Sequence, residues 1–259
     1  MRYWLIPVFL VAAGNAKGQA GANCIALGGN AANPFASISL VGNAAIFNSK
    51  SREFGFWGTK PFTGTSILRS GIAGHISGNN YAVGFSDEYS GTGYYFRNSL
   101  FTHFAQKWNE NTSAGISIGY LNIHQAMGFE SGHYLEGKLG LHSKLGKKST
   151  FSMVIKNPWV HQKQVDYTAS ADISVGYILA KNSRVFAQFQ TGGNKETAFG
   201  LALLHSISEK FKLRGAMQTG HSPVSAGLEY QKNNFYFSFA GNYHLYLGFT
   251  PSFTLVWKK

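Results

Sequence analysis

The chain has 259 residues, and only 13% of them are charged, about half the share of roughly 25% found in ordinary domains. Its 31 glycines and 15% aromatic residues suit strands and turns, which excludes a mainly helical protein. The net charge of +12 comes from basic residues scattered in ones and twos, which argues against a nucleic-acid-binding surface.

The first twenty residues have the pattern of a secretory signal peptide. A basic residue precedes an apolar run from Tyr3 to Ala13, and small residues near 18–20 suit a cleavage site. The run is too short to cross a bilayer, which takes about 20 apolar residues. We assign residues 1–20 to a signal peptide; a buried amino-terminal strand or helix is the alternative. The single cysteine, Cys24, is expected to be a packed free thiol.

Residues 21–51 differ from the chain that follows. They are rich in Gly and Ala, almost uncharged, and lack the alternation of a strand that faces two environments. Their Ile, Leu and Phe content argues against a disordered leader, which is the alternative interpretation. We therefore expect this segment to fold as a plug, or hatch, inside the domain formed by the rest of the chain.

From residue 52 onward, apolar side chains alternate with small or polar ones, in segments separated by turn residues. A period of two is that of a β-strand, whose successive side chains point to opposite faces. We predict about fourteen strands, at residues 52–60, 68–77, 79–87, 93–106, 111–122, 132–145, 148–156, 169–180, 184–193, 195–206, 210–219, 222–231, 233–243 and 249–257.

The strand at 132–145 indicates which environment each face meets. Leu135 and Leu139 alternate with Glu136 and Lys138. So many long strands with so little charge favour a membrane barrel, with the leucines facing lipid and the charged residues facing a polar lumen, over a soluble sandwich. The predicted fold is all-β: a transmembrane antiparallel β-barrel of about fourteen strands over residues 52–259, with an N-terminal plug segment.

The predicted turns also alternate. Every second turn is short and basic or polar, as in LGKKS at 145–149, whereas the others are longer or more varied, as in NPWVHQKQVDYTAS at 157–170. Outer-membrane barrels have short periplasmic turns and longer outer loops, and an even strand number places both termini in the periplasm. The turn pattern therefore predicts the orientation of the barrel.

Short motifs in the plug segment resemble those of a known family. CIALGGNAAN at 24–33, followed by LVGNAAIF at 40–47, is similar to the amino-terminal region of FadL-type barrels. It looks most like the PorV- and PorQ-like branch of Bacteroidota, which is associated with type IX secretion. Residues 26–29 match an Ala-Leu-Gly-Gly motif of that branch, and residues 42–45 stand where its Asn-Pro-Ala-Gly motif is expected, without the proline. The resemblance implies a 14-stranded barrel with an amino-terminal plug.

Charged and polar residues on the predicted inner face are the main candidates for function. Buried charges persist when they are paired or solvated, so they either hold the plug or line a polar conduit or ligand site. The lumen candidates are Arg69, Arg97, His103, Glu136, Lys138, His142, Lys212, Arg214 and Glu229. The plug candidates are Ala26, Leu27, Gly28, Gly29, Asn43 and Ala44. The outer-loop candidates for ligand or partner contacts are Met127, Phe129, Trp159, His161 and Tyr246.

No motif predicts catalysis. GISIG at 115–119 fits the G-x-S-x-G pattern, but Ser117 falls inside a predicted strand and not on the sharp strand-to-helix turn that the pattern requires. Several of the nine histidines fall in predicted outer loops, without the spacing of metal ligands. We expect no enzymatic activity, no metal and no cofactor.

Two functions of different classes follow from these observations. Short loops and an occluded lumen favour a non-enzymatic accessory barrel that binds partner proteins of an envelope machine, for type IX secretion or outer-membrane protein assembly. The alternative is a FadL-type transporter of small hydrophobic molecules; an outer-membrane enzyme is a weaker third. The expected partners are outer-membrane lipid and lipopolysaccharide, other envelope proteins in a complex and a hydrophobic small molecule, with no nucleic acid. The expected location is the cell outer membrane of a Gram-negative bacterium of the Bacteroidota.

Overall fold

A computed structural model describes residues 21–34, 38–92, 94–125, 131–160, 168–192, 197–221 and 223–259. The predicted signal peptide and the loop candidates Met127, Phe129 and His161 lie outside the described residues. Two short helices, α2 (Gly21–Ala26) and α3 (Ser39–Gly42), precede the strands. Neither helix of the described chain has the length and apolar character needed to cross a membrane.

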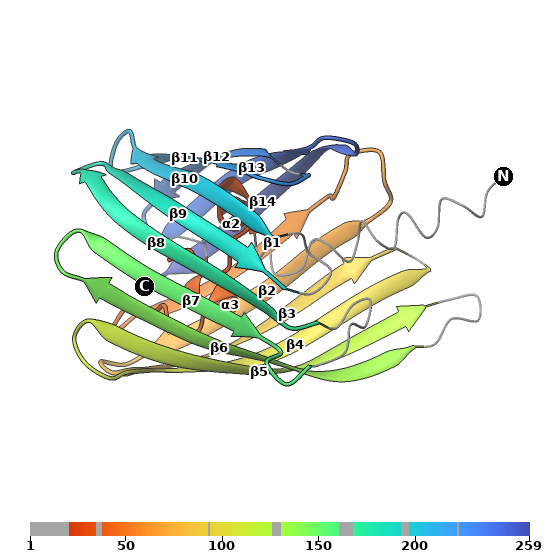
Figure 1. The fold of residues 1–259 in the computed structure, drawn as a ribbon, viewed down its shortest axis with the longest axis horizontal. Helices are drawn as coiled ribbons and strands as arrows, with labels where there is room; N and C mark the ends of the chain where they lie inside the picture. The colour runs from red at the N-terminus through yellow and green to blue at the C-terminus, as the bar shows by residue number, and fades with distance from the viewer. Residues whose placement is uncertain are drawn as a thin grey trace.

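Fourteen strands form one closed antiparallel barrel, in which each strand pairs with its neighbours in sequence and β1 closes against β14 (Figure 1). Closure leaves the ladder without a free edge strand, which removes the usual site of edge-to-edge aggregation. The strands are β1 (Arg52–Thr59), β2 (Leu68–Ser77), β3 (Tyr81–Gly91), β4 (Tyr95–Lys107), β5 (Thr112–Gln125), β6 (Gly132–Leu145), β7 (Ser149–Lys156), β8 (Ser170–Ala180), β9 (Ser183–Thr191), β10 (Ala198–Ser206), β11 (Phe211–Gln218), β12 (Val224–Lys232), β13 (Phe235–His244) and β14 (Gly248–Lys258).

The alternation along each strand separates an apolar outer face from a polar inner face. On β6, Leu135 and Leu139 are 60% and 45% exposed on the outside, whereas Glu136 between them is 6% exposed. On β13, Phe235, Phe237 and Phe239 are likewise exposed, although each is a large apolar side chain. An outer face of this kind suits hydrocarbon and not water, so the predicted all-β antiparallel barrel and the predicted outward orientation of the leucines are confirmed.

The two ends of the barrel differ. At the end that we call the terminal mouth, Arg52 at the start of β1 pairs through its backbone with Lys259 at the chain end, and the connections are short: 78–80, 108–111, 146–148, 181–182, 207–210 and 233–234. At the opposite end, the loop mouth, the connections are 60–67, 92–94, 126–131, 157–169, 192–197, 219–223 and 245–247. Those at 92–94 and 245–247 are as short as the turns of the terminal mouth, so the predicted difference in loop length holds only in part.

The predicted strand ends need one larger correction. We expected the third strand to end at residue 87, because the polar stretch that follows reads as a loop. Instead β3 continues to Gly91, which pairs with Phe96 on β4. Glu88 and Ser90 lie on the same face of the strand as the buried Ser86, so the polar residues of this extension face the lumen, where charge is tolerated.

The wall has a step between β6 and β7. β7 ends at Lys156, the partner of Lys138, so residues 132–136 of β6 pair with β5 but not with β7. Asn157, in a left-handed conformation with φ of 49°, closes the ladder by exchanging hydrogen bonds of 2.7 and 2.9 Å with the backbone of Gly137. The upper part of β6 is therefore a strand edge as far as the described residues show.

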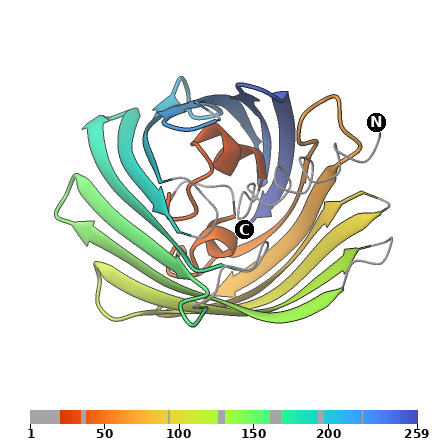
Figure 2. The same cartoon turned by 45° about the vertical axis from the view of Figure 1, so that its right-hand side comes forward.

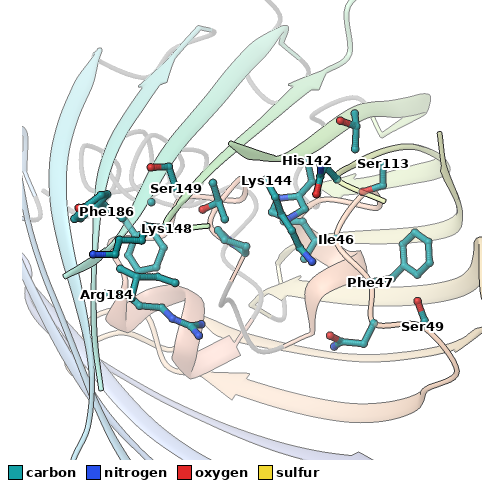
Figure 3. Close-up of a pocket in the computed structure, with 18 of the residues that line it drawn as sticks. Ile46, Phe47, Ser49, Ser113, His142, Lys144, Lys148, Ser149, Arg184 and Phe186 are labelled. Atoms are coloured by element: carbon teal, nitrogen blue, oxygen red, sulfur yellow. The ribbon is translucent and has the colours of Figure 1, made fainter. Parts of the chain in front are cut away.

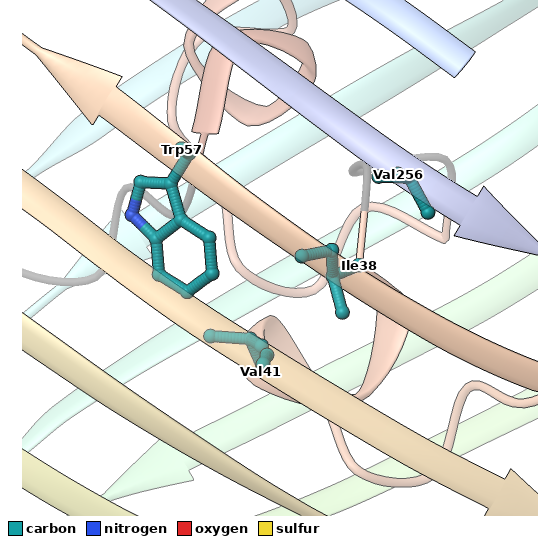
Figure 4. Close-up of a cluster of buried hydrophobic side chains, with 5 residues drawn as sticks. Ile38, Val41, Trp57 and Val256 are labelled. Carbon is teal, nitrogen blue, oxygen red and sulfur yellow. The ribbon is translucent and has the colours of Figure 1, made fainter. Parts of the chain in front are cut away.

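The segment before β1 lies inside the barrel, where α2 and α3 appear in red and orange in Figure 2. We call residues 21–34 and 38–46 the inner segment. Its described side chains are almost all buried. Ile38 and Val41 pack against Trp57 of β1 and Val256 of β14, and these form an apolar cluster on the otherwise polar inner face (Figure 4). Burying this cluster inside the wall stabilises the position of the inner segment.

Candidate functional site

The strongest polar contact between the wall and the inner segment is centred on Glu229 of β12. Its carboxylate accepts hydrogen bonds from Arg214 and Lys212 of β11, at 2.8 and 2.9 Å, and from the Asn23 side chain of α2, at 2.7 Å. Glu229 and Arg214 are almost fully buried, at 4% and 7% exposure. Three of the predicted lumen residues are thus brought together, and a charged network of this kind fixes α2 in position because an unpaired buried charge is costly.

A second carboxylate serves the same purpose on the other side of the lumen. Asp172 of β8, 2% exposed, pairs with Lys156 of β7 at 3.0 Å. The same carboxylate oxygen, Oδ2, also accepts a 3.4 Å hydrogen bond from the backbone amide of Ala31 in the inner segment. Sequence reasoning missed both residues. Lys156 and Asp172 are charged residues at inward positions near strand ends. An inward charge is the same sequence pattern that pointed to Glu229.

The short sequence Gly-Asn-Ala-Ala occurs twice in the inner segment, at 29–32 and at 42–45. In the second copy, the side-chain amide of Asn43 donates to the carbonyl oxygens of Leu141 on β6 and Met153 on β7, at 3.2 and 3.3 Å. These two residues are cross-strand partners. Asn43 Oδ1 accepts from the Ala45 amide at 3.0 Å, which holds the side chain in the orientation that reaches the wall.

The first copy makes the same set of contacts one hairpin further round the barrel. The amide of Asn30 donates to the carbonyl oxygens of Ile173 on β8 and Phe189 on β9, at 3.1 and 3.4 Å. These residues are again cross-strand partners. Asn30 Oδ1 accepts from Ala32 at 2.9 Å. Of the two asparagines, only Asn43 was among the predicted plug residues. The repeat of Gly-Asn-Ala-Ala is the sequence signal that points to Asn30 as well.

Glycine residues on the inner face of the wall allow the inner segment to lie this close to it. A Cβ atom at Gly115 of β5 would lie 2.5 Å from the backbone nitrogen of Ala45, and one at Gly227 of β12 would lie 2.7 Å from the Cβ of Ala26. Such distances are shorter than van der Waals contact, so only glycine fits at both positions unless the backbone moves. The inner segment and the wall are therefore complementary in shape as well as in hydrogen bonding.

The predicted plug residues all lie in the inner segment. Leu27 packs against Phe186, Ala202, Leu204 and Ala216, and the Ala26 carbonyl accepts a 3.3 Å hydrogen bond from Ser225. Ala44 packs on two alanines of β3 and β4. Gly28 and Gly29 have φ angles of 80° and 71°, which other residues adopt only with strain.

Lys138 is the other predicted lumen residue with a described contact to the inner segment. Its ammonium donates to the Val41 carbonyl at 3.1 Å and lies 4.1 Å from the centre of the Phe101 ring. Next to it, Glu136 pairs with Arg97 at 2.8 Å. Arg69 Nε donates a hydrogen bond to Ser90 Oγ, at 3.0 Å. These residues form a polar inner wall and do not converge on one point.

The two predicted lumen histidines form hydrogen bonds with serine hydroxyl groups. His103, which is fully buried, lies between Ser86 and Ser117 with nitrogen-to-oxygen distances of 2.9 and 2.8 Å. His142 contacts Ser152 at 2.7 Å. The Ser117–His103 pair has the distance expected of a nucleophile and its base, but full burial within the wall gives a substrate no access to it. Within the described chain, no group of three or more His, Cys, Asp or Glu is arranged to hold a metal ion.

At the loop mouth, the described outer-loop candidates lie apart. Trp159 covers the outward face of Gly137 at the step in the wall. Tyr246, which is 78% exposed, belongs to an aromatic group with His221, His244 and Phe62. The ring centres of His221 and Tyr246 are 5.7 Å apart, and those of Phe62 and His244 are 5.3 Å apart. We call these four residues the rim cluster.

A cavity of about 740 Å³ opens at the terminal mouth, below the inner segment (Figure 3). The turns 108–111 and 146–148 form part of its border. Phe186 lies near Lys148 and Arg184 on one side of it, and Ile46 lies near Lys144 on the other. Its lining therefore combines positive charge with apolar surface.

The fold is thus a closed fourteen-strand antiparallel barrel, similar to that of a FadL homologue and of hydrocarbon transporters. A structure of the toluene transporter TbuX of Ralstonia pickettii is similar, with a TM-score of 0.66 and 11% identity over 93% of this chain and 98% of that one. The monoaromatic hydrocarbon channel CymD gives a TM-score of 0.67 with 11% identity, covering 93% and 97% of the two chains. A FadL homologue of Pseudomonas aeruginosa gives 0.59 with 8% identity, covering 92% and 98%.

No family model matches the sequence. No curated protein matches it either. The similarity is therefore one of fold.

Proposed function

We propose that this protein is an outer-membrane transporter of small hydrophobic molecules, in which residues 21–51 plug the barrel. The observation that carries the proposal is the inner segment, which is joined to the wall through Glu229, Asp172 and the two asparagines. A lumen filled in this way does not suit free diffusion of polar solutes. An apolar molecule, in contrast, needs a route that avoids water, and the apolar outer face supplies a surface to which it can escape.

The fold similarity supports the same choice. The similar structures are described as transporters or channels for toluene and other monoaromatic hydrocarbons, and no described contact of this chain favours the accessory role that we first predicted. That role remains a prediction without support. An outer-membrane location follows from the same argument, with the terminal mouth in the periplasm. The Bacteroidota origin and the PorV- and PorQ-like relationship likewise remain predictions.

The rim cluster is the proposed capture site. Its rings are exposed or half-buried at the loop mouth, where a hydrophobic molecule would arrive from outside. Aromatic rings attract an aromatic ligand through edge and face contacts, in addition to the effect of the area that they bury. The step between β6 and β7, covered on the outside by Trp159, is the proposed opening toward the membrane.

The test is uptake of radiolabelled toluene by a Gram-negative host that produces the full chain. We expect a higher rate of toluene uptake than in the same host without this protein. In the Phe62→Ala/Tyr246→Ala variant, the rate should fall most of the way to that of the host without the protein. Tyr81→Ala is the matched control, because Tyr81 is an exposed tyrosine at the other end of the barrel.

Uptake equal to that of the empty host, with the barrel present in the outer membrane, would refute transport of this class of molecule. If stoichiometric protein partners then copurified after gentle extraction, the accessory role would replace it.

A further inference from the structure

Positive charge gathers in the cavity at the terminal mouth. Lys107, Lys144, Lys147, Lys148, Arg184, Lys212, Arg214 and Lys258 line the cavity. The acidic residues that line it are Glu53, Glu110 and Glu229. Positive residues therefore exceed negative ones by five among the residues that line this one cavity.

Two of the three carboxylates are already neutralised. Glu229 binds Arg214 and Lys212, and Glu53 binds Lys258. Other positive residues lie on the opposite part of the border, on β6 and on the turn that follows it. Among the described residues, Lys144, Lys147 and Lys148 form no ion pair. A cavity with several unpaired cations in partial enclosure favours entry of an anion.

The position of these residues separates them from ordinary lysines at a membrane surface. Lysines at strand ends commonly reach toward lipid phosphates from the outer face of a barrel. Lys144 and Arg184 instead lie on the inward register of their strands, shared with His142 on β6 and Phe186 on β9. Figure 3 shows both side chains beside the cavity. Both side chains therefore start from the lumen side of the wall and not from its outer face.

Apolar side chains line the same cavity. They are Ile46 at the end of the inner segment, Phe47 directly after it, Phe186 of β9 and Val256 of β14. The Lys107 ammonium lies 5.5 Å from the centre of the Phe47 ring, so charge and aromatic surface are adjacent. A pocket that joins apolar walls to a few charged groups suits a ligand with an apolar body and one anionic end.

We infer that the cavity at the terminal mouth is a binding site for a small organic anion, a carboxylate or phosphate carried on an apolar body. Lys144, Lys148 and Arg184 would bind the anionic group, and Ile46, Phe47 and Phe186 would contact the body. This site goes beyond the proposed transport of neutral molecules, since it lies at the other end of the barrel from the rim cluster and its chemistry is different.

The test is calorimetric titration of the full chain in a non-ionic detergent with three probes: benzoate, inorganic phosphate and toluene. Benzoate is expected to bind more tightly than phosphate or toluene at this site. In the Lys144→Gln/Lys148→Gln variant, benzoate binding should weaken about tenfold or more. The matched control is Lys181→Gln/Lys232→Gln, which makes the same change of net charge with two exposed lysines that do not line the cavity.

The salt dependence of benzoate affinity and the comparison with the control variant decide whether the anion binds at this cavity. Benzoate affinity should fall when ionic strength rises from about 0.01 M to about 0.15 M, because the screening length shortens from about 30 Å to about 8 Å. Equal benzoate binding by the two double variants would overturn the site. Phosphate binding as tight as that of benzoate would overturn the role of the apolar lining. Toluene uptake is measured separately, so this inference and the proposed function can fail independently.

Discussion

At the scale of single residues, Glu229 shows how the lumen tolerates charge. The carboxylate lies between two cations of β11 and an amide of α2, and all four groups come from inward positions or from the inner segment. A pairing of this kind contributes modestly to stability when intact but is costly to break, because the partner left behind is a buried charge.

Replacement of Glu229 by Gln tests this network. It leaves the Arg214 guanidinium buried without its counter-ion, and we expect a loss of about 3–5 kcal/mol in the free energy of unfolding. Chemical unfolding of the detergent-solubilised protein, followed by tryptophan fluorescence, measures the loss. Glu209→Gln, at an exposed turn position, is the control and should change little. A similar small effect of both substitutions would show that the network does not stabilise the fold.

At the scale of elements, the inner segment is held to two neighbouring hairpins by a repeated motif. Asn43 bridges β6 and β7, and Asn30 bridges β8 and β9, with equivalent atoms in equivalent roles. Each side chain satisfies its own backbone turn and the wall at the same time. Because both copies are buried, loss of either side chain leaves a buried backbone amide, that of Ala32 or Ala45, without its hydrogen-bond acceptor.

The motif predicts equal and additive effects. Asn30→Ala and Asn43→Ala should each lower the free energy of unfolding by about 1–3 kcal/mol, and the double variant should lose about the sum, since the two sites share no partner. The protease sensitivity of the amino-terminal segment in the intact barrel should rise in each single variant, and it should rise further in the double variant. The control Asn79→Ala alters an exposed side chain at a turn. A double variant no weaker than either single variant would mean that the two bridges do not act independently.

At the scale of the whole molecule, the closed ladder and the apolar outer face together determine where the barrel is stable. Outward side chains that would aggregate in water become favourable in hydrocarbon, and closure pairs every described strand with a neighbour on both sides, apart from the upper part of β6. The depth of a residue in the wall should therefore set the cost of a charge on the outer face.

Two outward leucines on the same strand test this dependence on depth. Leu139→Arg, near the middle of β6, should cost about 2–4 kcal/mol, whereas Leu145→Arg, at the strand end, should cost about 0–1 kcal/mol. The fraction of folded barrel is measured by the shift in gel mobility between unheated and boiled samples. Equal folding yields would argue against a membrane-spanning wall, as would the lack of a mobility shift in the unsubstituted protein.

The sequence alone determined the wall of this protein. Antiparallel strands joined by short turns pair with their neighbours in the chain, so the period of two and the turn residues were enough to place fourteen strands and to assign leucines to one face and charges to the other. The end of β3 was missed because a polar stretch on an inward face has the same composition as a loop. The same alternation was enough to place the lumen charges on the inner face of the wall.

Only the tertiary structure decided what these charges contact. Asn23 binds Glu229 across 206 positions of sequence, and Asn30 binds carbonyl groups on β8 and β9. Such contacts depend on how the inner segment lies in the barrel, which no local periodicity encodes. The cavity at the terminal mouth also arises from closure, because it brings Lys144, Arg184 and Val256 from distant strands around one space. Local alternation dictates a strand's two faces, whereas long-range packing dictates which side chains meet inside.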